Sequence, residues 1–197
     1  MFAHGQTHRS APTKIPLHLQ QTRPNDFYVL LLSKTESASR NLAKFLAYLT
    51  GALMILMVCV VFCDVMMRYL FNSGSIAMQE LEWHLFAAIF LLGAAYALRE
   101  DSHVRVDVFY DRFSPKEKAI VNIFGILFML IPFCTVIAYG SIDFVAYSFS
   151  IVEKSPDPGG LPYRFILKSL IPLSYVLLLV QGIGEVCRNL KKLCSAS

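Results

Sequence analysis

Residues 78–118 read MQELEWHLFAAIFLLGAAYALREDSHVRVDVFYDRFSPKEK. Sixteen of these residues, 83–98, contain no Asp, Glu, Lys or Arg, and an Arg-Glu-Asp triplet ends the run. Sixteen helical residues extend about 24 Å, which is less than the roughly 30 Å hydrocarbon core of a bilayer. Glu80 and Arg99 must therefore lie at the two membrane interfaces. The stretch predicts a transmembrane helix with charged side chains at both ends.

The segment that follows this span, SHVRVDVFYDRF at 102–113, alternates charged and apolar residues. It is too charged to cross a bilayer and too apolar to be a free tail, so we expect a short segment covered by the interface or by a partner. The next four residues, Ser114 to Glu117, offer a hydroxyl cap, a proline at the first helical position and a glutamate three residues after the cap. This pattern predicts a helix from Pro115.

The composition of the chain is that of an integral membrane protein. Of its 197 residues, 55% are hydrophobic and 16% are charged, and the mean hydropathy is +0.52. Soluble domains carry about 25% charged residues. The net charge of +4 is spread over the loops rather than gathered in one stripe, which argues against a nucleic-acid partner. The five cysteines show neither a disulfide framework nor metal-like spacing with histidines.

The chain is predicted to be an all-α integral membrane protein with four transmembrane helices. Long runs without charge at 45–63 and 119–142 support the first and third spans, and Pro132 predicts a kink in the third. The turn EKSPDPGG at 153–160 separates the third span from the fourth. The membrane domain is predicted at 41–192, with spans at about 42–71, 79–99, 115–149 and 161–187.

The termini are predicted to lie in the cytoplasm. Residues 1–40 contain prolines that interrupt helical patterns, so they are interpreted as a flexible cytoplasmic extension, and 193–197 as a short tail. Fourteen of the eighteen Lys and Arg residues fall in residues 1–44, 99–118 and 185–197. Because basic residues favour the cytoplasmic side, these three regions are predicted to be inside.

The charged residues at the ends of the spans admit structural and functional interpretations. Asp64 and Arg68 are one helical turn apart, so they can pair at the rim of the first span, or each can extend toward headgroups and partners. Glu80 and Glu82 point in different directions on a helix, so separate contacts with water, lipid headgroups or a partner are expected rather than a shared cation. Lys168 is expected to extend toward the interface from the first turns of its span.

The sequence contains no recognisable catalytic motif. It has no glycine-rich phosphate loop, no C-x-x-C and no H-E-x-x-H, so an enzyme is not predicted. A haem held between helices needs two histidines, and only His84 lies in a predicted span. A proton-coupled transporter needs a carboxylate in mid-span, whereas the carboxylates here lie at span ends. No catalytic, cofactor or metal site is therefore expected.

Three motifs carry a resemblance to a known family. They are G-A-A-Y-A-L-R at 93–99, H-x-R-V-D at 103–107 and Y-D-R at 110–112, and they follow an acidic pair and R-Y-L-F-N at 68–72. Their order and spacing resemble the small membrane subunit (DctQ-type) of tripartite ATP-independent periplasmic (TRAP) transporters. The resemblance covers about residues 42–190.

The resemblance implies a division of labour in the bacterial inner membrane. A periplasmic solute-binding protein captures an organic acid such as a C4-dicarboxylate or keto acid, and a large polytopic permease subunit moves it, coupled to sodium. The small subunit extends the static scaffold and holds no cofactor. Substrate selectivity then belongs to the other two components. The residues of this chain that match family motifs, expected to serve packing and docking, are Arg68, Glu80, Glu82, Gly93, Tyr96, Arg99, His103, Arg105, Asp107, Asp111, Arg112, Gly160, Pro162 and Lys168.

Three alternatives stay open from the residues alone. The chain is also compatible with a membrane anchor subunit of a redox enzyme, with a stand-alone small four-helix transporter, and with a membrane scaffold outside transport. A haem spectrum, solute flux without partners, or neighbours that include no secreted binding protein would support the first, second and third of these, respectively.

Overall fold

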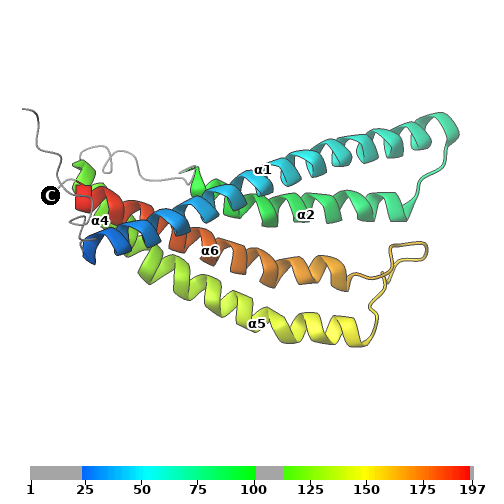
Figure 1. Cartoon of the computed structure of the whole chain (residues 1–197). Helices are drawn as coiled ribbons and strands as arrows, with labels where there is room; N and C mark the ends of the chain where they lie inside the picture. Colours follow the sequence, from blue (N-terminus) through cyan, green and yellow to red (C-terminus); the bar gives the residue numbers. More distant parts are fainter. Residues whose placement is uncertain (1–23, 101–112, 196–197) are drawn as a thin grey trace, which may run out of the picture.

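The computed structural model describes residues 24–100 and 113–195, and every regular element in these ranges is helical (Figure 1). Within these ranges, four helical segments are long and apolar enough to cross a membrane. The predicted fold class, an all-α protein with four transmembrane helices, is confirmed. These segments are 30–71, 76–99, 115–150 and 165–194.

The first helix, α1, runs over Pro24–Phe71 and is longer than predicted. Its 48 residues extend about 72 Å, so it reaches well beyond a bilayer core of about 30 Å unless it is strongly tilted. The helix includes residues 24–40, which were interpreted as part of a flexible extension, and the domain boundary predicted at residue 40 stays a prediction. Pro24 does not prevent helix formation because a proline in the first turn gives up no helical hydrogen bond. The helix ends where Asn72 adopts a left-handed conformation, with φ 49°.

The next helix, α2, runs over Ile76–Arg99, close to the predicted second span. The third span is composite: α4 (Pro115–Gly125) passes into the π-helical turn η2 (Ile126–Leu130) and then into α5 (Ile131–Ser150). The wide turn directly precedes Pro132, which has no N–H to continue the α-helical ladder, and this is where a kink was predicted. The predicted capping box at the start of α4 is confirmed, because Ser114 and Glu117 exchange both hydrogen bonds.

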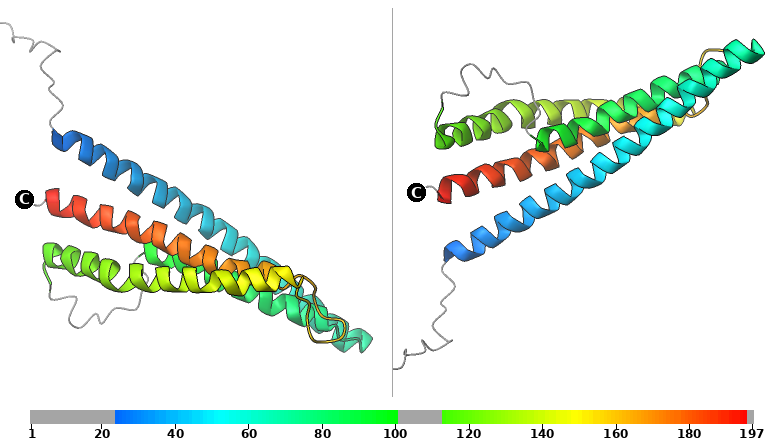
Figure 2. Two further views of the ribbon diagram at one scale, coloured as in Figure 1. Left: turned by 90° about the horizontal axis from the view of Figure 1, so that it is seen from below. Right: turned by 90° about the horizontal axis from the view of Figure 1, so that it is seen from above.

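The last helix, α6 (Phe165–Ser195), lies at the centre of the bundle. It contacts α1, α2, α4 and α5, whereas α1 pairs mainly with α2. Figures 1 and 2 show the resulting arrangement of two antiparallel pairs, α1 with α2 and α5 with α6. The buried core is small and lies where α1, α2 and α6 meet. It is formed by Leu46, Leu92 and Ala95, with Leu42, Leu49, Leu53, Tyr96, Leu177 and Leu178 packed against them.

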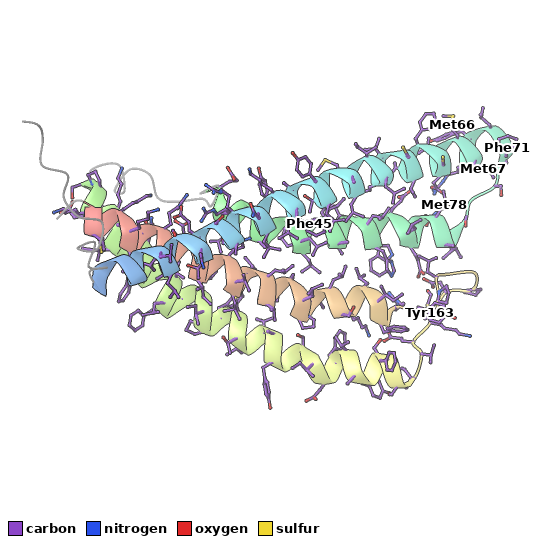
Figure 3. The ribbon with its side chains drawn as sticks, viewed as in Figure 1. Phe45, Met66, Met67, Phe71, Met78 and Tyr163 are labelled. Atoms are coloured by element: carbon purple, nitrogen blue, oxygen red, sulfur yellow. The ribbon has the colours of Figure 1, made fainter. Side chains whose placement is uncertain are left out.

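The bundle has two distinct ends. We call the end that carries the connections 72–75 and 151–164 the turn end, and the end that carries the start of α1 and the last turns of α6 the terminal end. Figure 3 shows Met66, Met67 and Phe71 of α1 near Met78 of α2 at the turn end, where Tyr163 also lies. Both ends are rich in polar contacts, and the middle is apolar.

Candidate subunit interface

Glu80 fixes the loop between α5 and α6 to the start of α2. Its side chain lies near the beginning of α2 and is buried, at 5% exposure. The backbone N–H of Leu161 donates to Oε2 at 2.6 Å, and the hydroxyl of Ser155 donates to Oε1. The expected contacts of Glu80 with water, headgroups or a partner are thus wrong for this side chain. Its partners belong to the same chain, and both carboxylate oxygens are occupied.

Gly160 allows this close approach. A Cβ atom at this position would lie 2.9 Å from Glu80 Oε2 and closer still to the side chain of Ser155. A larger residue would push the loop away from α2, so the site requires glycine. Two residues that match the family motifs therefore meet in one contact. Two more residues that match the family motifs lie near this contact: Glu82 is half-buried and Pro162 is exposed.

A second contact at the turn end joins α6 to the end of α5. Lys168 donates to Oε2 of Glu153, and the hydroxyl of Ser148 donates to the same oxygen at 2.5 Å. These two donors, Lys168 first, hold the pKa of the Glu153 carboxyl below its ordinary value. Lys168 thus extends from the first turns of α6 to the loop after α5, as expected for its position, and its partner there belongs to the same chain. We call the two contacts around Glu80 and Glu153 the turn clamp.

The terminal end is held by an ion cluster around the buried side chain of Arg99. This side chain is 7% exposed and lies 3.8 Å from Glu36 of α1 and 3.8 Å from Glu185 of α6. Arg188 contacts Glu185 at 2.6 Å, and Lys191 contacts Glu36 at 3.4 Å. Both carboxylates therefore have two cationic neighbours. The cluster, which we call the terminal clamp, links three helices at the point where α2 ends.

A buried hydrogen-bonded pair extends the terminal clamp into the bundle. The hydroxyl of Ser39 donates to Oε1 of Gln181 at 2.5 Å, and Nε2 of Gln181 donates to the backbone carbonyl of Ser39 at 3.0 Å. Both side chains are buried. Gly184 lies one turn further along α6, where a Cβ atom would collide with the Ser39 side chain. The α1 and α6 backbones approach closely here because residue 184 has no side chain.

Three other motif features have local roles. Asp64 and Arg68 pair at 2.5 Å within α1, which is one of the two arrangements that their i, i+4 spacing allows. Gly93 faces α1, where an added Cβ would make an ordinary contact of 3.9 Å with Thr50. Tyr96 packs against the buried core. None of these three features brings distant polar groups together.

The remaining predicted site residues belong to the segment after α2. They lie outside the described residues, so the prediction that this segment is packed stays a prediction. They are His103, Arg105, Asp107, Asp111 and Arg112.

The middle of the bundle presents large apolar side chains outward. In the described helices, residues 45–63, 83–98 and 119–142 contain no Asp, Glu, Lys or Arg. Within the described ranges there is also no group of three side chains suited to bind a metal ion. Such a surface suits lipid chains or the helices of another membrane protein. Examples with at least half of their area exposed are Phe45, Ile55, Phe62, Phe133, Tyr139 and Tyr147.

Sequence reasoning missed the partners that make up the clamps. Glu36 and Ser39 fell in the segment interpreted as a flexible extension, and Ser155 fell in a turn. One signal was available for Gln181, because an amide side chain inside a long apolar span must find a partner in a membrane. For the others, the contact depends on how the helices pack.

These features define a class: a small helical membrane protein with four spans, whose polar groups join its own helices and whose long faces are apolar. The model of the family described as tripartite ATP-independent periplasmic transporters, DctQ component, matches residues 57–192. This is more than half of the chain, and the chain belongs to that family. It is the small permease subunit of a TRAP transporter and a multi-pass protein of the bacterial inner membrane. The family is one of transporter subunits and not a class of enzymes.

Two relatives from Haemophilus influenzae carry the name TRAP transporter small permease protein. One is 34% identical over 144 residues, which cover 71% of this chain and 89% of that protein. Another is 25% identical over 121 residues, covering 61% of this chain and 72% of the relative. The region that matches the family contains the turn clamp and the part of the terminal clamp that belongs to α2 and α6.

Proposed function

We propose that this chain is the static scaffold subunit beside a large polytopic permease subunit. Together with a periplasmic solute-binding protein, the two subunits take up an organic acid, such as a C4-dicarboxylate or keto acid, in symport with sodium. The proposal rests on one observation, which is how polar and apolar groups are distributed over the bundle. The charged side chains of both clamps are used within the chain, and the described mid-span surfaces are apolar.

This distribution of polar and apolar surface is more suitable for a structural support than for a pathway of a polar solute. A polar solute that crosses the bilayer needs polar groups along its route, and the described middle of this bundle supplies no charge. Clamps at both ends fix the position of each helix relative to the others. A moving permease domain needs a neighbour of this kind, which keeps its shape while the domain moves.

Docking on the large subunit is expected on an apolar face that contains small residues. Helices in membranes associate through close packing, which small residues allow. A Cβ atom added to Gly51 of α1 or to Gly140 of α5 would meet no atom of another helix within 4 Å, so each glycine can face another helix or lipid. A leucine at either position would leave the fold of this chain intact and block a close approach from outside.

Co-purification tests this arrangement. A tagged chain, co-expressed with the large subunit, is expected to bring that subunit down in mild detergent. Gly51→Leu or Gly140→Leu should lower the yield of the large subunit at unchanged yield of the tagged chain, and the sensitive position identifies the docking face. Full recovery with both variants would contradict docking through either face. Absence of any large polytopic partner from the wild type would overturn the scaffold role.

Uptake tests the transport part of the proposal. Cells that lack only this chain are expected to lose sodium-dependent uptake of a labelled organic acid, and the full chain should restore it. Uptake that persists in the deletion strain, with the large subunit present, would overturn the requirement for this subunit. Uptake that needs no sodium would overturn the proposed symport while leaving the scaffold role open to the co-purification test.

The proposed orientation places both termini in the cytoplasm, in accord with the distribution of Lys and Arg. In a variant without the five native cysteines, Asp157→Cys and Lys116→Cys place single thiols at exposed positions of the two ends. An impermeant maleimide added to spheroplasts should label Asp157→Cys and leave Lys116→Cys unlabelled until the cells are lysed. The opposite pattern would invert the topology.

A further inference from the structure

A basic cavity opens beside the terminal clamp, at the junction of α1, α2 and α6. Its volume is about 300 Å³, about ten times the share of one water molecule in the liquid, which is roughly 30 Å³. Four of its six lining side chains are cationic and one is acidic. The lining residues are Arg40, Ala43, Lys44, Arg99, Glu100 and Arg188. We propose that this cavity binds the phosphate of an anionic phospholipid, whose acyl chains then run along α1.

Arg99 supplies the observation that points to a ligand. Its side chain is more than nine-tenths buried and lines the cavity. Its Nη1 group lies 3.8 Å from Oε2 of Glu185, and neither of these two atoms has a hydrogen-bond partner among the described residues. The ion-pair distances of 3.8 Å to Glu36 and Glu185 are too long for hydrogen bonds. A buried guanidinium N–H without an acceptor is costly. A phosphate oxygen is an acceptor of the geometry and charge that guanidinium groups bind best.

The charge around the cavity favours an anion even after the acidic residues are counted. Glu36, Glu185 and Glu100 offset three of the four cations, which leaves a net positive charge. Arg40 and Lys44 are exposed, and neither pairs with a carboxylate within the described part of the chain. They stand one turn apart on α1, at the outer edge of the cavity. A single phosphate can contact both of them and still reach toward Arg99.

The surface next to the cavity argues for a lipid rather than for free phosphate. Arg40, Lys44 and Tyr48 follow one another at intervals of four residues, so they form one stripe along α1. Tyr48 is 81% exposed, and Gly51 and Ile55 continue the stripe toward mid-span, with Ile55 68% exposed. An aromatic ring at the interface followed by apolar surface is what a phospholipid requires below its headgroup. Basic cavities between helix ends are suited to anionic headgroups.

The test measures lipid binding to the full-length purified chain by native mass spectrometry. Phosphatidylglycerol and phosphatidylcholine with identical acyl chains are titrated into a neutral detergent, and inorganic phosphate is tested as a competitor. The variant Arg40→Gln/Lys44→Gln removes the two outer cations. The matched control Lys34→Gln/Lys116→Gln removes two exposed cations from the same end and none from the cavity.

Phosphatidylglycerol should bind the wild type more tightly than phosphatidylcholine does. Two interfacial cations contribute a combined factor of about 10 to 30 in affinity, so the cavity variant should lose that factor and the control should not. Lys44→Gln alone should lose about fivefold, and circular dichroism checks that each variant is folded. Equal binding of the two lipids, or equal losses in cavity variant and control, would overturn the proposal. Displacement of phosphatidylglycerol by millimolar inorganic phosphate would show that the cavity binds free phosphate and would overturn the proposal of a lipid site.

Discussion

The terminal clamp predicts an unequal response to removing its two buried charges. Arg99→Met removes the central cation, but Glu185 keeps Arg188 at 2.6 Å and Glu36 keeps Lys191 at 3.4 Å. Glu185→Gln removes the deepest carboxylate, and Arg99 then retains only Glu36, at 3.8 Å and without a hydrogen bond. The first change leaves every charge with a partner. The second leaves a buried cation poorly compensated.

The magnitudes follow from these distances. At 3.8 Å and an effective dielectric constant of about 20, one ion pair contributes about 4 kcal/mol before the cost of desolvation is subtracted. Replacing a buried ion by an apolar side chain also removes that cost, so we expect Arg99→Met to lower the free energy of unfolding by about 1 to 2 kcal/mol. Leaving a buried charge without its partner costs about 3 to 5 kcal/mol, which is the loss expected for Glu185→Gln.

Unfolding of the purified chain by sodium dodecyl sulfate in mixed micelles can measure the difference. Trp83 is the sole tryptophan and lies at the opposite end, so its fluorescence reports on unfolding of the whole bundle rather than on the substituted site. Asp157→Asn, which removes an exposed carboxylate, is the control and should change stability by less than about 0.5 kcal/mol. An Arg99→Met variant that is less stable than Glu185→Gln would refute the account of how the charges are shared.

Two further predictions concern the helix contacts and the turn clamp. Gly184→Ala should lower the free energy of unfolding by about 1 to 3 kcal/mol, because its Cβ would overlap Ser39, whereas Gly140→Ala meets open space and should be neutral or slightly stabilising in the same assay. The lowered pKa of Glu153 means that its contact with Lys168 contributes fully above about pH 4.5 and is lost as the pH falls through the lowered value. Hydrogen exchange at residues 153–161 should therefore speed up in acid in the wild type, beyond the intrinsic pH effect. Glu153→Gln should reduce this additional acceleration without removing it, because the Glu80 carboxylate still holds Ser155 and Leu161. Equal behaviour of both proteins would contradict the role of Glu153.

Contacts between residues close in the chain could be predicted from the sequence. The capping box at Ser114 depends only on local spacing and was predicted correctly, and the pairing of Asp64 with Arg68 was one of two arrangements that helical spacing allowed. The four spans followed from long apolar runs. A kink at Pro132 was predicted from the missing N–H of proline, and the structure has a π-helical turn just before it. Each of these features is decided within a few residues.

Contacts between distant segments could not be predicted in this way. Arg99 and Glu80 were recognised as motif residues, but their partners depend on which helix faces meet. Apolar faces do not settle this in a membrane, because lipid chains cover them as well as another helix does. The start of α1 was missed for the same reason, since Glu36 and Ser39 obtain their roles only from α2 and α6. A single sequence does not show how the helices pack, so it does not determine these pairings.

The positions of the two clamps explain how so small a core supports four helices. Burial of apolar surface provides little drive for helix association within lipid, so polar contacts and close packing must supply it. A single polar contact leaves a helix free to tilt about it, whereas contacts at both ends fix its tilt and its rotation. The central helix α6 takes part in both clamps, through Lys168 at one end and Glu185 at the other. Loss of either clamp should therefore loosen one end of the whole bundle while the four spans remain inserted, so assembly with a partner subunit is expected to fail before membrane insertion does.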